Sequence, residues 1–441
     1  MNPYVQYMYS YPHKTAYRPL KGVSLKEYAS LLSGGGHGLY LHIPFCQAKC
    51  GYCNLFSVTG QGKEAMDRYL DAVERQAGQY AELLMKYRCE FSDLVIGGGT
   101  PLFLAEEQLE RVFCLLETYF AFAPGRQAVI ETAPNQTTGE KLAILKQMGI
   151  TRVSMGIQSF RDEELLALRR RHTGEVARKA LALLKSYEFP CVNVDFIYGI
   201  PGQTVESLLM SLKEALEYAP EEIFLYPLYV KHGVGLEREG VVTEPEAAYG
   251  QYLAASRYLL GEGFRQDSMR RFVRQDTAAG QGSGAKQENS REFFDCGSGT
   301  SLALGCGGRS YLGNLHFCTP YAVDREACLR RLAEYENTRD YTEITHGILL
   351  SEEEEKRRYV IRHLLIRPGI EMHLYQERFK KNVLEDFPLL QDWQEQGLIE
   401  VQCGGQEEFL VLTEKGLGLS DYLGPELISP QVRKAMEEWN P

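Results

Sequence analysis

From residue 39 onward, short apolar runs alternate with amphipathic stretches of helical period, and this alternation restricts the fold more than any other feature. Strand, helix and strand joined by short connections predict parallel pairing, with each helix crossing over the sheet. The predicted strands cover residues 39–43, 93–96, 128–132, 152–156, 191–197 and 222–228. We therefore expect an α/β fold in which six βα units form an incomplete parallel barrel, open on one side.

The length of 441 residues and an apolar content of 44% predict a globular chain of two or three domains. The barrel should occupy residues 39–262, and residues 263–340 should extend its sheet. Within that extension, residues 275–292 are rich in Gly, Ser, Gln and Asn, which predicts a flexible loop that gates entry to the site.

The two ends of the chain differ from the barrel. Residues 1–38 are rich in tyrosine and only weakly periodic, which favours an extended N-terminal arm on the surface over an arm that folds across the site. Residues 341–441 should form a separate helical domain. In it, Ser351 and Glu354 make a capping box, and two short apolar runs around Gly404 and Gly405 predict a hairpin, which gives a winged-helix shape.

Charge and apolar runs exclude several classes of protein. The formal net charge is 48 minus 59, or −11, and residues 351–441 carry 11 Lys and Arg against 18 Asp and Glu. Phosphate binding needs clustered cations, so we expect no nucleic-acid partner, even for the winged-helix domain. No apolar run approaches the roughly 20 residues of a membrane span. Eleven cysteines, an odd number without a preceding signal segment, fit a reducing cytoplasm.

Three of these cysteines lie within eight residues, as Cys46, Cys50 and Cys53. A closed structural zinc site usually takes four ligands in two separated pairs, and iron-sulfur clusters are held by cysteine thiolates. A 4Fe-4S cube held by only three cysteines keeps one iron open for another ligand. The triplet therefore predicts a reactive cluster, in preference to zinc or to unligated core cysteines.

Other distinctive residues follow the predicted strands where their carboxyl ends should meet, which is where α/β folds build active sites. The run from Gly97 to Thr100 lets a ligand approach the main chain closely, although it could also be only a tight turn. Glu131 and Asp195 are carboxylates at apolar strand ends, where each needs a partner. A ribose hydroxyl or an ammonium group would serve, and so would Arg170 for one of them.

Four motifs together resemble the radical S-adenosylmethionine enzymes, and within them the oxygen-independent coproporphyrinogen III oxidase-like group. These motifs are the cysteine loop, Gly97–Pro101, Ser154–Phe160 and Asp195–Thr204, and the resemblance covers roughly residues 39–430. It implies a TIM-like partial barrel, a 4Fe-4S cluster on the three cysteines, and S-adenosylmethionine chelating the open iron. One electron would cleave this cofactor to a 5′-deoxyadenosyl radical that abstracts hydrogen from a substrate.

The same resemblance implies roles for individual residues. Tyr40 and Tyr52 would flank the cluster and the adenosine, and Gly97, Gly98, Gly99 and Thr100 would meet the amino group of the methionine part. The polar positions that hold the methionine and the ribose match Glu131, Gln158, Arg170 and Asp195. A low-potential electron donor of flavodoxin or ferredoxin type is implied as a partner. The resemblance assigns no catalytic residue for the substrate.

The sequence departs from the pattern of this group at two places, so the resemblance does not identify the substrate. A tetrapyrrole or haem is the candidate. Leu55 stands where the decarboxylase of this group has a further cysteine, and residues 290–295 lack the histidine of the His-Asn motif that is typical of the haem-chaperone branch. Besides an enzyme with a tetrapyrrole substrate, two alternatives remain. One is a haem-binding chaperone, with His316 or His13 as axial ligand. The other is a methyltransferase with a second S-adenosylmethionine, for which the sequence locates no site.

Overall fold

The computed structural model describes residues 2–8, 10–275, 299–405 and 407–439. One large sheet dominates them, with strand order β1-β15-β14-β13-β12-β2-β5-β6-β7-β8-β9-β11-β10. Its central strands are β2 (His37–Ile43), β5 (Glu90–Gly98), β6 (Ala121–Thr132), β7 (Arg152–Gln158), β8 (Cys191–Tyr198) and β9 (Glu222–Pro227). Each of them pairs in parallel with the next. The prediction of six parallel βα units is therefore confirmed.

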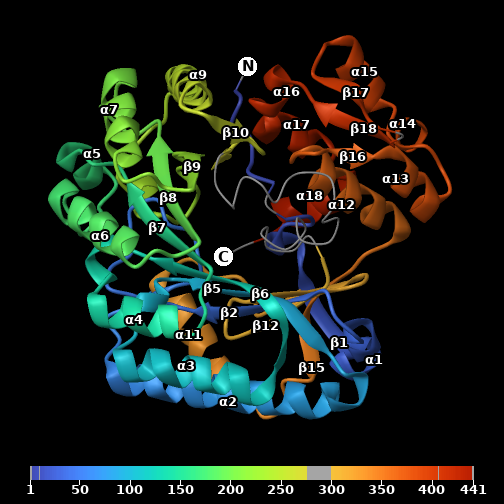
Figure 1. Ribbon diagram of the computed structural model, residues 1–441. Helices are drawn as coiled ribbons and strands as arrows, with labels where there is room; N and C mark the ends of the chain where they lie inside the picture. Colours follow the sequence, from blue (N-terminus) through green and yellow to red (C-terminus); the bar gives the residue numbers. More distant parts are fainter. Residues whose placement is uncertain (1, 9, 276–298, 406, 440–441) are drawn as a thin grey trace.

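Helices cover the outer face of these strands (Figure 1). They are α2 (Lys63–Leu84), α3 (Glu106–Tyr119), α4 (Gly139–Gln147), α5 (Asp162–Ala167), α6 (Gly174–Ser186), α7 (Val205–Leu216) and α9 (Pro245–Gly261). The short helix α8 (Gly235–Arg238) instead contacts the cysteine loop, where the N–H of Leu236 donates to the carbonyl of Gly51 at 2.8 Å. Threonines set the start of three of the outer helices, since Thr138, Thr173 and Thr204 accept hydrogen bonds from backbone N–H groups in the first turn. The apolar faces of the helices and the strands form one continuous core.

Further strands extend the sheet at both ends. They are β1 (Arg18–Ser24), β10 (Phe264–Gln266), β11 (Arg271–Arg274), β12 (Ser301–Leu304), β13 (Arg309–Leu312), β14 (Leu315–Cys318) and β15 (Glu343–Leu349). β12 pairs in parallel with β2, while β11 runs antiparallel to β9. Two short strands, β3 (Phe45–Cys46) and β4 (Val58–Thr59), pair with each other on either side of the cysteine loop. The predicted loop 275–292 lies outside the described residues beyond Gln275, as does the stretch 290–295.

The C-terminal part has a separate core of its own. Its elements are α12 (Glu352–Leu364), β16 (Ile370–Glu371), α13 (Met372–Phe379), α14 (Val383–Asp386), α15 (Leu389–Glu395), β17 (Ile399–Gly404), β18 (Glu407–Leu412), α16 (Glu414–Leu417), α17 (Ser420–Glu426) and α18 (Pro430–Glu437). The helix α11 (Arg325–Glu336), which precedes β15, packs on α2 and belongs to the main core. Ser351 caps α12 by accepting from the N–H of Glu354, and β17 pairs with β18 as a hairpin. Both features agree with the winged-helix prediction.

The expectation of a surface arm over residues 1–38 is wrong for much of that segment. Tyr11 and Tyr17 are 0% and 2% exposed, and β1 is an edge strand of the main sheet, antiparallel to β15. The short 3-10 helices Lys14–Ala16 and Ala29–Leu32 and the helix α1 (Leu25–Tyr28) complete the segment. Tyrosine rings bury much apolar area, which favours packing them between two domains over leaving them in water.

Candidate functional site

The residues that the sequence predicts for a site lie along one edge of the sheet, at the C-terminal ends of the parallel strands. Tyr40 is in β2, Gly97 and Gly98 end β5, and Gly99 and Thr100 follow them. The remaining positions are Glu131 in β6, Gln158 at the end of β7, Arg170 after α5 and Asp195 in β8. Parallel strands bring their carboxyl ends to the same side, so residues up to 155 positions apart (195 minus 40) share this edge.

The cysteine loop is held from several directions. Cys46 belongs to β3, and the N–H of Cys53 donates to the carbonyl of Cys50 at 3.1 Å, which closes a tight turn. The N–H of Gly51 donates to the carbonyl of Leu168 at 3.0 Å, which ties the loop to the end of α5. Two side chains reach the sulfurs: Thr100 Oγ1 lies 3.6 Å from Cys46 Sγ, and Arg170 Nη1 lies 3.1 Å from Cys50 Sγ.

The three thiols can serve as ligands of a cluster or of a single ion. Within the ranges that the structure describes, no three His, Cys, Asp or Glu side chains are grouped closely enough to hold one metal ion. A 4Fe-4S cube does not need such a group, because each cysteine binds a different corner. Burial raises the pKa of the Cys46 thiol to about 12 and also raises the pKa of Cys53. Both thiols therefore stay protonated until a metal displaces the proton.

The glycines after β5 leave room that any side chain would fill. A Cβ on Gly99 would come within 2.7 Å of the Phe45 carbonyl oxygen and 2.9 Å of Cys46 Sγ. Gly98 has φ of +119°, a conformation that only glycine adopts readily, and its Cβ would meet the His42 ring at 2.7 Å. The backbone thus passes directly beside the cysteine loop, and a ligand there would contact main-chain atoms.

Two carboxyl groups lie at this edge, Glu131 on β6 beside the glycine backbone and Asp195 on β8, two strands further along the sheet. Glu131 accepts a hydrogen bond from the N–H of Gly98 at 3.0 Å, and Asp195 accepts one from Asn193 Nδ2 at 2.7 Å. Burial raises the pKa of Glu131 to about 7 and that of Asp195 to about 6, and the proximity of Asp195 raises the Glu131 value further. Carboxyl groups in this state gain stability from a ligand that donates hydrogen bonds or carries positive charge.

Several polar atoms around them have no hydrogen-bond partner among the described residues. They are Gln158 Oε1, Arg170 Nε and Asn193 Oδ1, all buried. Gln158 also has φ of +74°, which is uncommon for a residue other than glycine. Buried polar groups without partners are costly, so their convergence here indicates a site for a polar ligand. The thiols, the bare glycine backbone and these atoms together fit a 4Fe-4S cluster with S-adenosylmethionine.

Asn193 was not among the predicted site residues. Its Nδ2 donates both to Asp195 Oδ1 and to Ser154 Oγ, the latter at 2.6 Å, so it orients the Asp195 carboxyl. The signal in the sequence was the Asn193-Val-Asp195 spacing, because residues two apart on a strand point to the same face. His42 was also not among the predicted site residues, and its signal was again a spacing of two residues along a strand. It lies two residues after Tyr40, whose hydroxyl is 3.0 Å from His42 Nδ1.

The two predicted tyrosines lie on different sides of the site. Tyr40 is half-buried and contacts His42, whereas Tyr52 packs against a small apolar cluster that includes Leu168 and Leu236. Burial raises the pKa of the Tyr52 hydroxyl well above its usual value, so this group stays neutral. Tyr52 therefore supports the cysteine loop from the side where α5 and α8 meet it.

The histidines considered as haem ligands are both buried. His316 in β14 is 0% exposed, and its ring packs edge-on against Tyr311 with centroids 4.8 Å apart. Burial lowers the pKa of His316 well below its usual value. His13 Nδ1 lies 2.9 Å from Thr15 Oγ1 within the N-terminal segment. Neither histidine is among the residues that line the two cavities described below, and both ring nitrogens of His316 lack a hydrogen-bond partner among the described residues.

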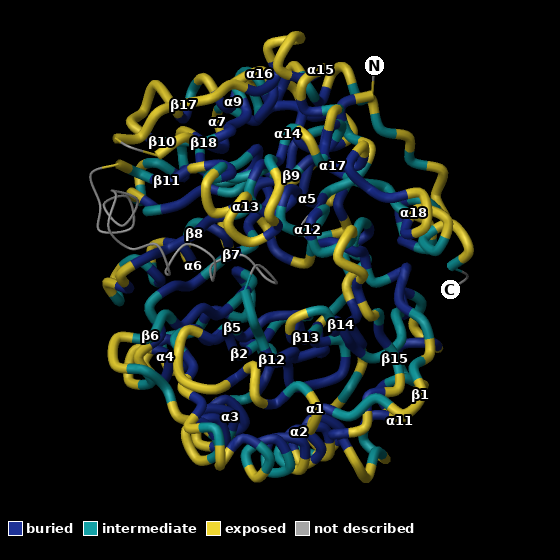
Figure 2. The backbone as a smooth tube through the Cα atoms, turned by 90° about the vertical axis from the view of Figure 1, so that its right-hand side faces the viewer, coloured by how far each residue is buried: buried dark blue, intermediate teal, exposed yellow. Residues whose placement is uncertain are grey.

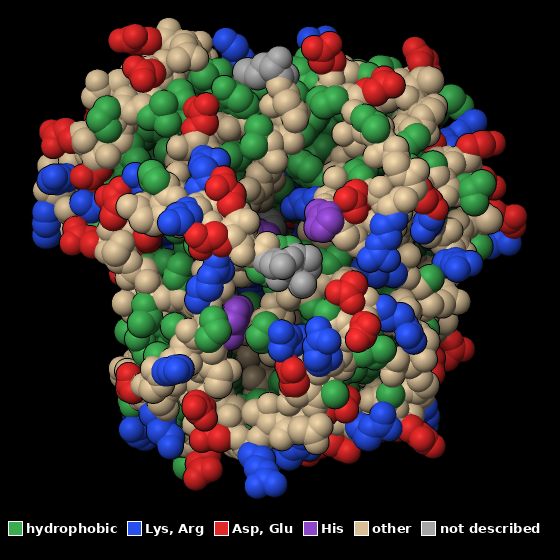
Figure 3. All heavy atoms as spheres, turned by 180° about the vertical axis from the view of Figure 1, so that it is seen from behind, with side chains coloured by type: hydrophobic (Ala, Val, Ile, Leu, Met, Phe, Trp, Pro, Cys, Tyr) green, Lys and Arg blue, Asp and Glu red, His purple; other side chains and the backbone are tan. Residues whose placement is uncertain are grey.

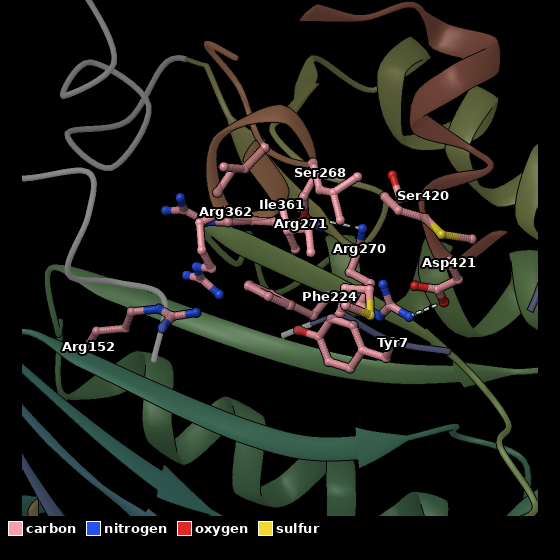
Figure 4. Close-up of a pocket in the computed structure, with 14 residues that line it drawn as sticks. Tyr7, Arg152, Phe224, Ser268, Arg270, Arg271, Ile361, Arg362, Ser420 and Asp421 are labelled. Atoms are coloured by element: carbon pink, nitrogen blue, oxygen red, sulfur yellow. Dashed lines mark hydrogen bonds and ion pairs between the residues drawn. The ribbon is translucent and has the colours of Figure 1, made fainter. Parts of the chain in front are cut away.

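A small cavity of about 60 Å³ lies at the junction between the barrel and the C-terminal part (Figure 4). Four arginines line it: Arg152, Arg270, Arg271 and Arg362. Glu222 pairs with Arg152 at 2.6 Å and with Arg271 at 2.5 Å, and Asp421 pairs with Arg270. The volume holds only a few water molecules. The junction therefore holds a buried ionic contact between the barrel and the C-terminal part.

Comparison with known proteins agrees with the geometry. Residues 40–215 match the Radical SAM superfamily. The heme chaperone HemW of Mycobacterium tuberculosis is 33% identical over 209 residues, which are 47% of this chain and 53% of that protein. The match thus spans about half of that relative's length. The oxygen-independent coproporphyrinogen III oxidase of Escherichia coli is 26% identical over 390 residues, covering 86% of this chain and 82% of that protein.

A solved structure of coproporphyrinogen III oxidase (HemN) from Escherichia coli, described as a radical SAM enzyme, aligns with a TM-score of 0.78 at 22% identity and covers 98% of each chain. This likeness establishes the fold. In the described ranges, no helix combines the length and the apolar character that a membrane span requires. The superfamily uses a 4Fe-4S cluster and S-adenosylmethionine. Residues 40–215 of this chain are thus similar to the Radical SAM superfamily, and the chain is similar in sequence to the oxygen-independent coproporphyrinogen III oxidases and the HemW proteins.

Proposed function

We propose that this protein is a radical S-adenosylmethionine enzyme of the coproporphyrinogen III oxidase-like group, with Cys46, Cys50 and Cys53 as the ligands of a 4Fe-4S cluster. The observation that carries the proposal is the convergence of three thiols, a bare glycine backbone and two proton-binding carboxyl groups on one edge of the sheet. When bound, the cluster and S-adenosylmethionine supply a 5′-deoxyadenosyl radical that removes a hydrogen atom from the substrate.

Different residues of the chain would bind different parts of S-adenosylmethionine. The backbone from Gly97 to Thr100 would lie along the methionine part of S-adenosylmethionine. Glu131, which now accepts a hydrogen bond from the N–H of Gly98, would pair with the ammonium group of that methionine part. Asp195, oriented by Asn193, would accept hydrogen bonds from the ribose hydroxyls.

Two further side chains would complete the binding. Gln158 Oε1 and Arg170 Nε, which lack hydrogen-bond partners among the described residues, would bind further polar atoms of the cofactor. Arg170 also lies 3.1 Å from Cys50 Sγ, where its positive charge would stabilise the thiolate.

The substrate we propose is a tetrapyrrole, on the strength of the named relatives, which act on coproporphyrinogen III or carry haem. Leu55 stands beside the cluster ligands where the decarboxylase group has a cysteine. This departure argues against decarboxylation of coproporphyrinogen III itself, so the proposed reaction is hydrogen abstraction from a tetrapyrrole of another kind. A haem chaperone is the second candidate function, favoured by 33% identity to HemW over 209 residues.

The decisive experiment measures 5′-deoxyadenosine. The cluster is reconstituted without oxygen, S-adenosylmethionine and dithionite are added, and the nucleoside is quantified with and without a tetrapyrrole other than coproporphyrinogen III. We expect nucleoside formation that rises with substrate. Haem is titrated in parallel and followed by absorbance. Tight haem binding without any nucleoside would overturn the enzyme proposal in favour of the chaperone.

Cysteine variants test the ligand assignment. Cys50→Ala should lose both the visible absorbance of the cluster and nucleoside formation, because the cube would keep only two protein ligands. Cys403→Ala is the matched control, since Cys403 is exposed on the hairpin strand β17, far along the chain from the loop. A Cys50→Ala protein that retains the cluster would contradict the assignment.

A further inference from the structure

A second cavity, of about 360 Å³, is lined by residues of the 3-10 helix Lys14–Ala16, the segment before α11, α11, β15 and the stretch after α18. Figure 2 shows α11, β15 and α18 along the same side of the molecule. Its polar and aromatic lining consists of Lys14, Tyr321, Arg330, Arg331, His346 and Trp439. All lining residues belong to the described part of the chain, and none of them is acidic. The cavity is therefore basic and aromatic, although the chain as a whole carries a net charge of −11.

Only one layer of chain separates this cavity from the cysteine loop. The hydroxyl of Tyr321 donates to the carbonyl of Asn54 at 2.8 Å, and Asn54 directly follows Cys53. Lys49, which lies between Cys46 and Cys50, donates to the carbonyl of Val323 at 2.5 Å. The ring of Tyr321 thus forms part of the cavity wall while its hydroxyl contacts the residue next to a predicted cluster ligand.

The cations around Tyr321 are only partly neutralised. Lys14 Nζ lies 3.7 Å from the centre of the Tyr321 ring, on which Trp439 also packs, with centroids 5.0 Å apart. Arg331 pairs with Glu334 at 2.7 Å, but the ion pairs among the described residues include none with Lys14 or Arg330. Burial, with Arg309 and Lys231 nearby, lowers the pKa of Lys14 to about 7. A neighbouring carboxylate would favour its charged form.

We propose that this cavity is the docking site for an acidic protein that carries a one-electron reductant, an inference that rests on the proposed function. Acidic and basic side chains are interspersed over the rear face (Figure 3), whereas the residues that line the cavity include no acidic one. The cavity offers local positive charge next to the cluster loop, where complementary charge would speed encounter and fix orientation. One electron passes from the donor to the cluster. No covalent bond is formed or broken in this step, and no proton is transferred.

The test compares two reductants on three proteins: the unchanged chain, Arg330→Glu, and Arg257→Glu as the control. Arg330 and Arg257 are both exposed helix residues, on α11 and α9, so each substitution reverses one surface charge without disturbing the core. Reduced flavodoxin, an acidic flavoprotein, is the probe, and dithionite is the reference. At limiting flavodoxin, Arg330→Glu should lower the initial rate of 5′-deoxyadenosine formation about tenfold.

With dithionite, all three proteins should form the nucleoside at the same rate, and Arg330→Lys should recover most of the flavodoxin rate. Raising ionic strength should slow the flavodoxin reaction of the unchanged protein and bring it towards that of Arg330→Glu. Equal flavodoxin rates for the unchanged protein and Arg330→Glu would overturn the docking proposal, while activity with dithionite would leave the proposed function standing.

A binding measurement decides the docking surface even if no nucleoside forms. Flavodoxin is titrated calorimetrically into each cluster-loaded protein, a readout that does not depend on cleavage of S-adenosylmethionine. Binding that weakens in Arg330→Glu but not in Arg257→Glu supports the cavity as the docking site. Equal affinities for all three proteins would overturn it.

Discussion

At the scale of single residues, Gly99 is the glycine of the site whose missing side chain leaves room for backbone and for a cysteine sulfur. A methyl group there would overlap the Phe45 carbonyl oxygen at 2.7 Å and Cys46 Sγ at 2.9 Å, and backbone cannot move aside cheaply. We expect Gly99→Ala to destabilise the protein by about 1–3 kcal/mol and to lower cluster loading. Urea unfolding and the visible absorbance after reconstitution measure the two effects.

Gly35→Ala serves as the control, because a Cβ at Gly35 has no atom within 4 Å and its φ is ordinary. That variant should load the cluster fully and unfold at the same urea concentration as the unchanged chain. Equal cluster loading in Gly99→Ala would show that the backbone there does not depend on glycine.

The carboxyl groups of Glu131 and Asp195 make a prediction about pH. Burial raises their pKa values to about 7 and about 6, above those of an unfolded chain, so the folded state keeps protons that the unfolded state has lost. Stability of the cofactor-free protein should therefore fall as pH rises from about 4 to about 7. Urea midpoints measured across this range should show a smaller fall in Glu131→Gln.

The same variant should lose affinity for the cofactor. If Glu131 binds the ammonium group as a carboxylate, S-adenosylmethionine should bind the unchanged protein more tightly as pH rises through about 7, and Glu131→Gln should lose this dependence. Calorimetric titration at pH 6 and pH 8 measures it. The control is Glu82→Gln, on the exposed face of α2. A pH dependence that persists in Glu131→Gln would assign it to another group.

At the scale of elements, the contact between barrel and C-terminal part depends on a buried ion pair. Arg270, just before β11, and Asp421, in α17, have side chains only 5% and 1% exposed, and the Tyr229 hydroxyl also donates to Asp421. Asp421→Asn would leave the Arg270 charge buried without its partner, which typically costs about 3–5 kcal/mol. Thermal unfolding should show a clearly lower midpoint.

An exposed pair provides the comparison. Arg18 and Glu438 lie 3.9 Å apart with side chains 41% and 57% exposed, and such pairs contribute little because water screens them. Glu438→Gln should leave the midpoint of unfolding nearly unchanged. If Asp421→Asn behaved in the same way, the buried pair would not be what holds the two parts together.

At the scale of the whole molecule, the N-terminal segment connects the two cores. Tyr4 packs on Tyr198 and Tyr249 beside the barrel core, while Met8 and Tyr11 belong to the C-terminal core. Tyr11 also donates to Glu354 and accepts from the N–H of Ser429. We expect a protein that begins at Arg18 to unfold in two calorimetric transitions, because contacts that couple the cores are gone.

The full chain, and a control that lacks only residues 1 and 2, should each unfold in one transition. A single transition for the shortened protein would show that the ionic junction alone couples the cores.

Much of the fold and of the site followed from local pattern. Apolar runs predicted β7 from Arg152 and β8 from Cys191 at their observed first residues, since parallel strands buried on both faces are nearly continuous in apolar residues. The cysteine spacing and the residues after each strand predicted one shared edge. Asn193 and His42 were not predicted as site residues because each is a single polar residue within an apolar strand. Its role depends on which side chains lie next to it in the folded sheet, and the sequence does not give them.

By itself the sequence determined the parallel barrel, the shared edge with its three cysteines, and the hairpin of the C-terminal part, because each depends on contacts and periodicities within a few residues. Only the tertiary structure decided that the tyrosine-rich segment is buried, that β1 joins β15, and that Lys14, Tyr321 and Arg330 line one cavity next to Asn54. These contacts join residues hundreds of positions apart, and no local pattern records which distant surface a side chain will meet.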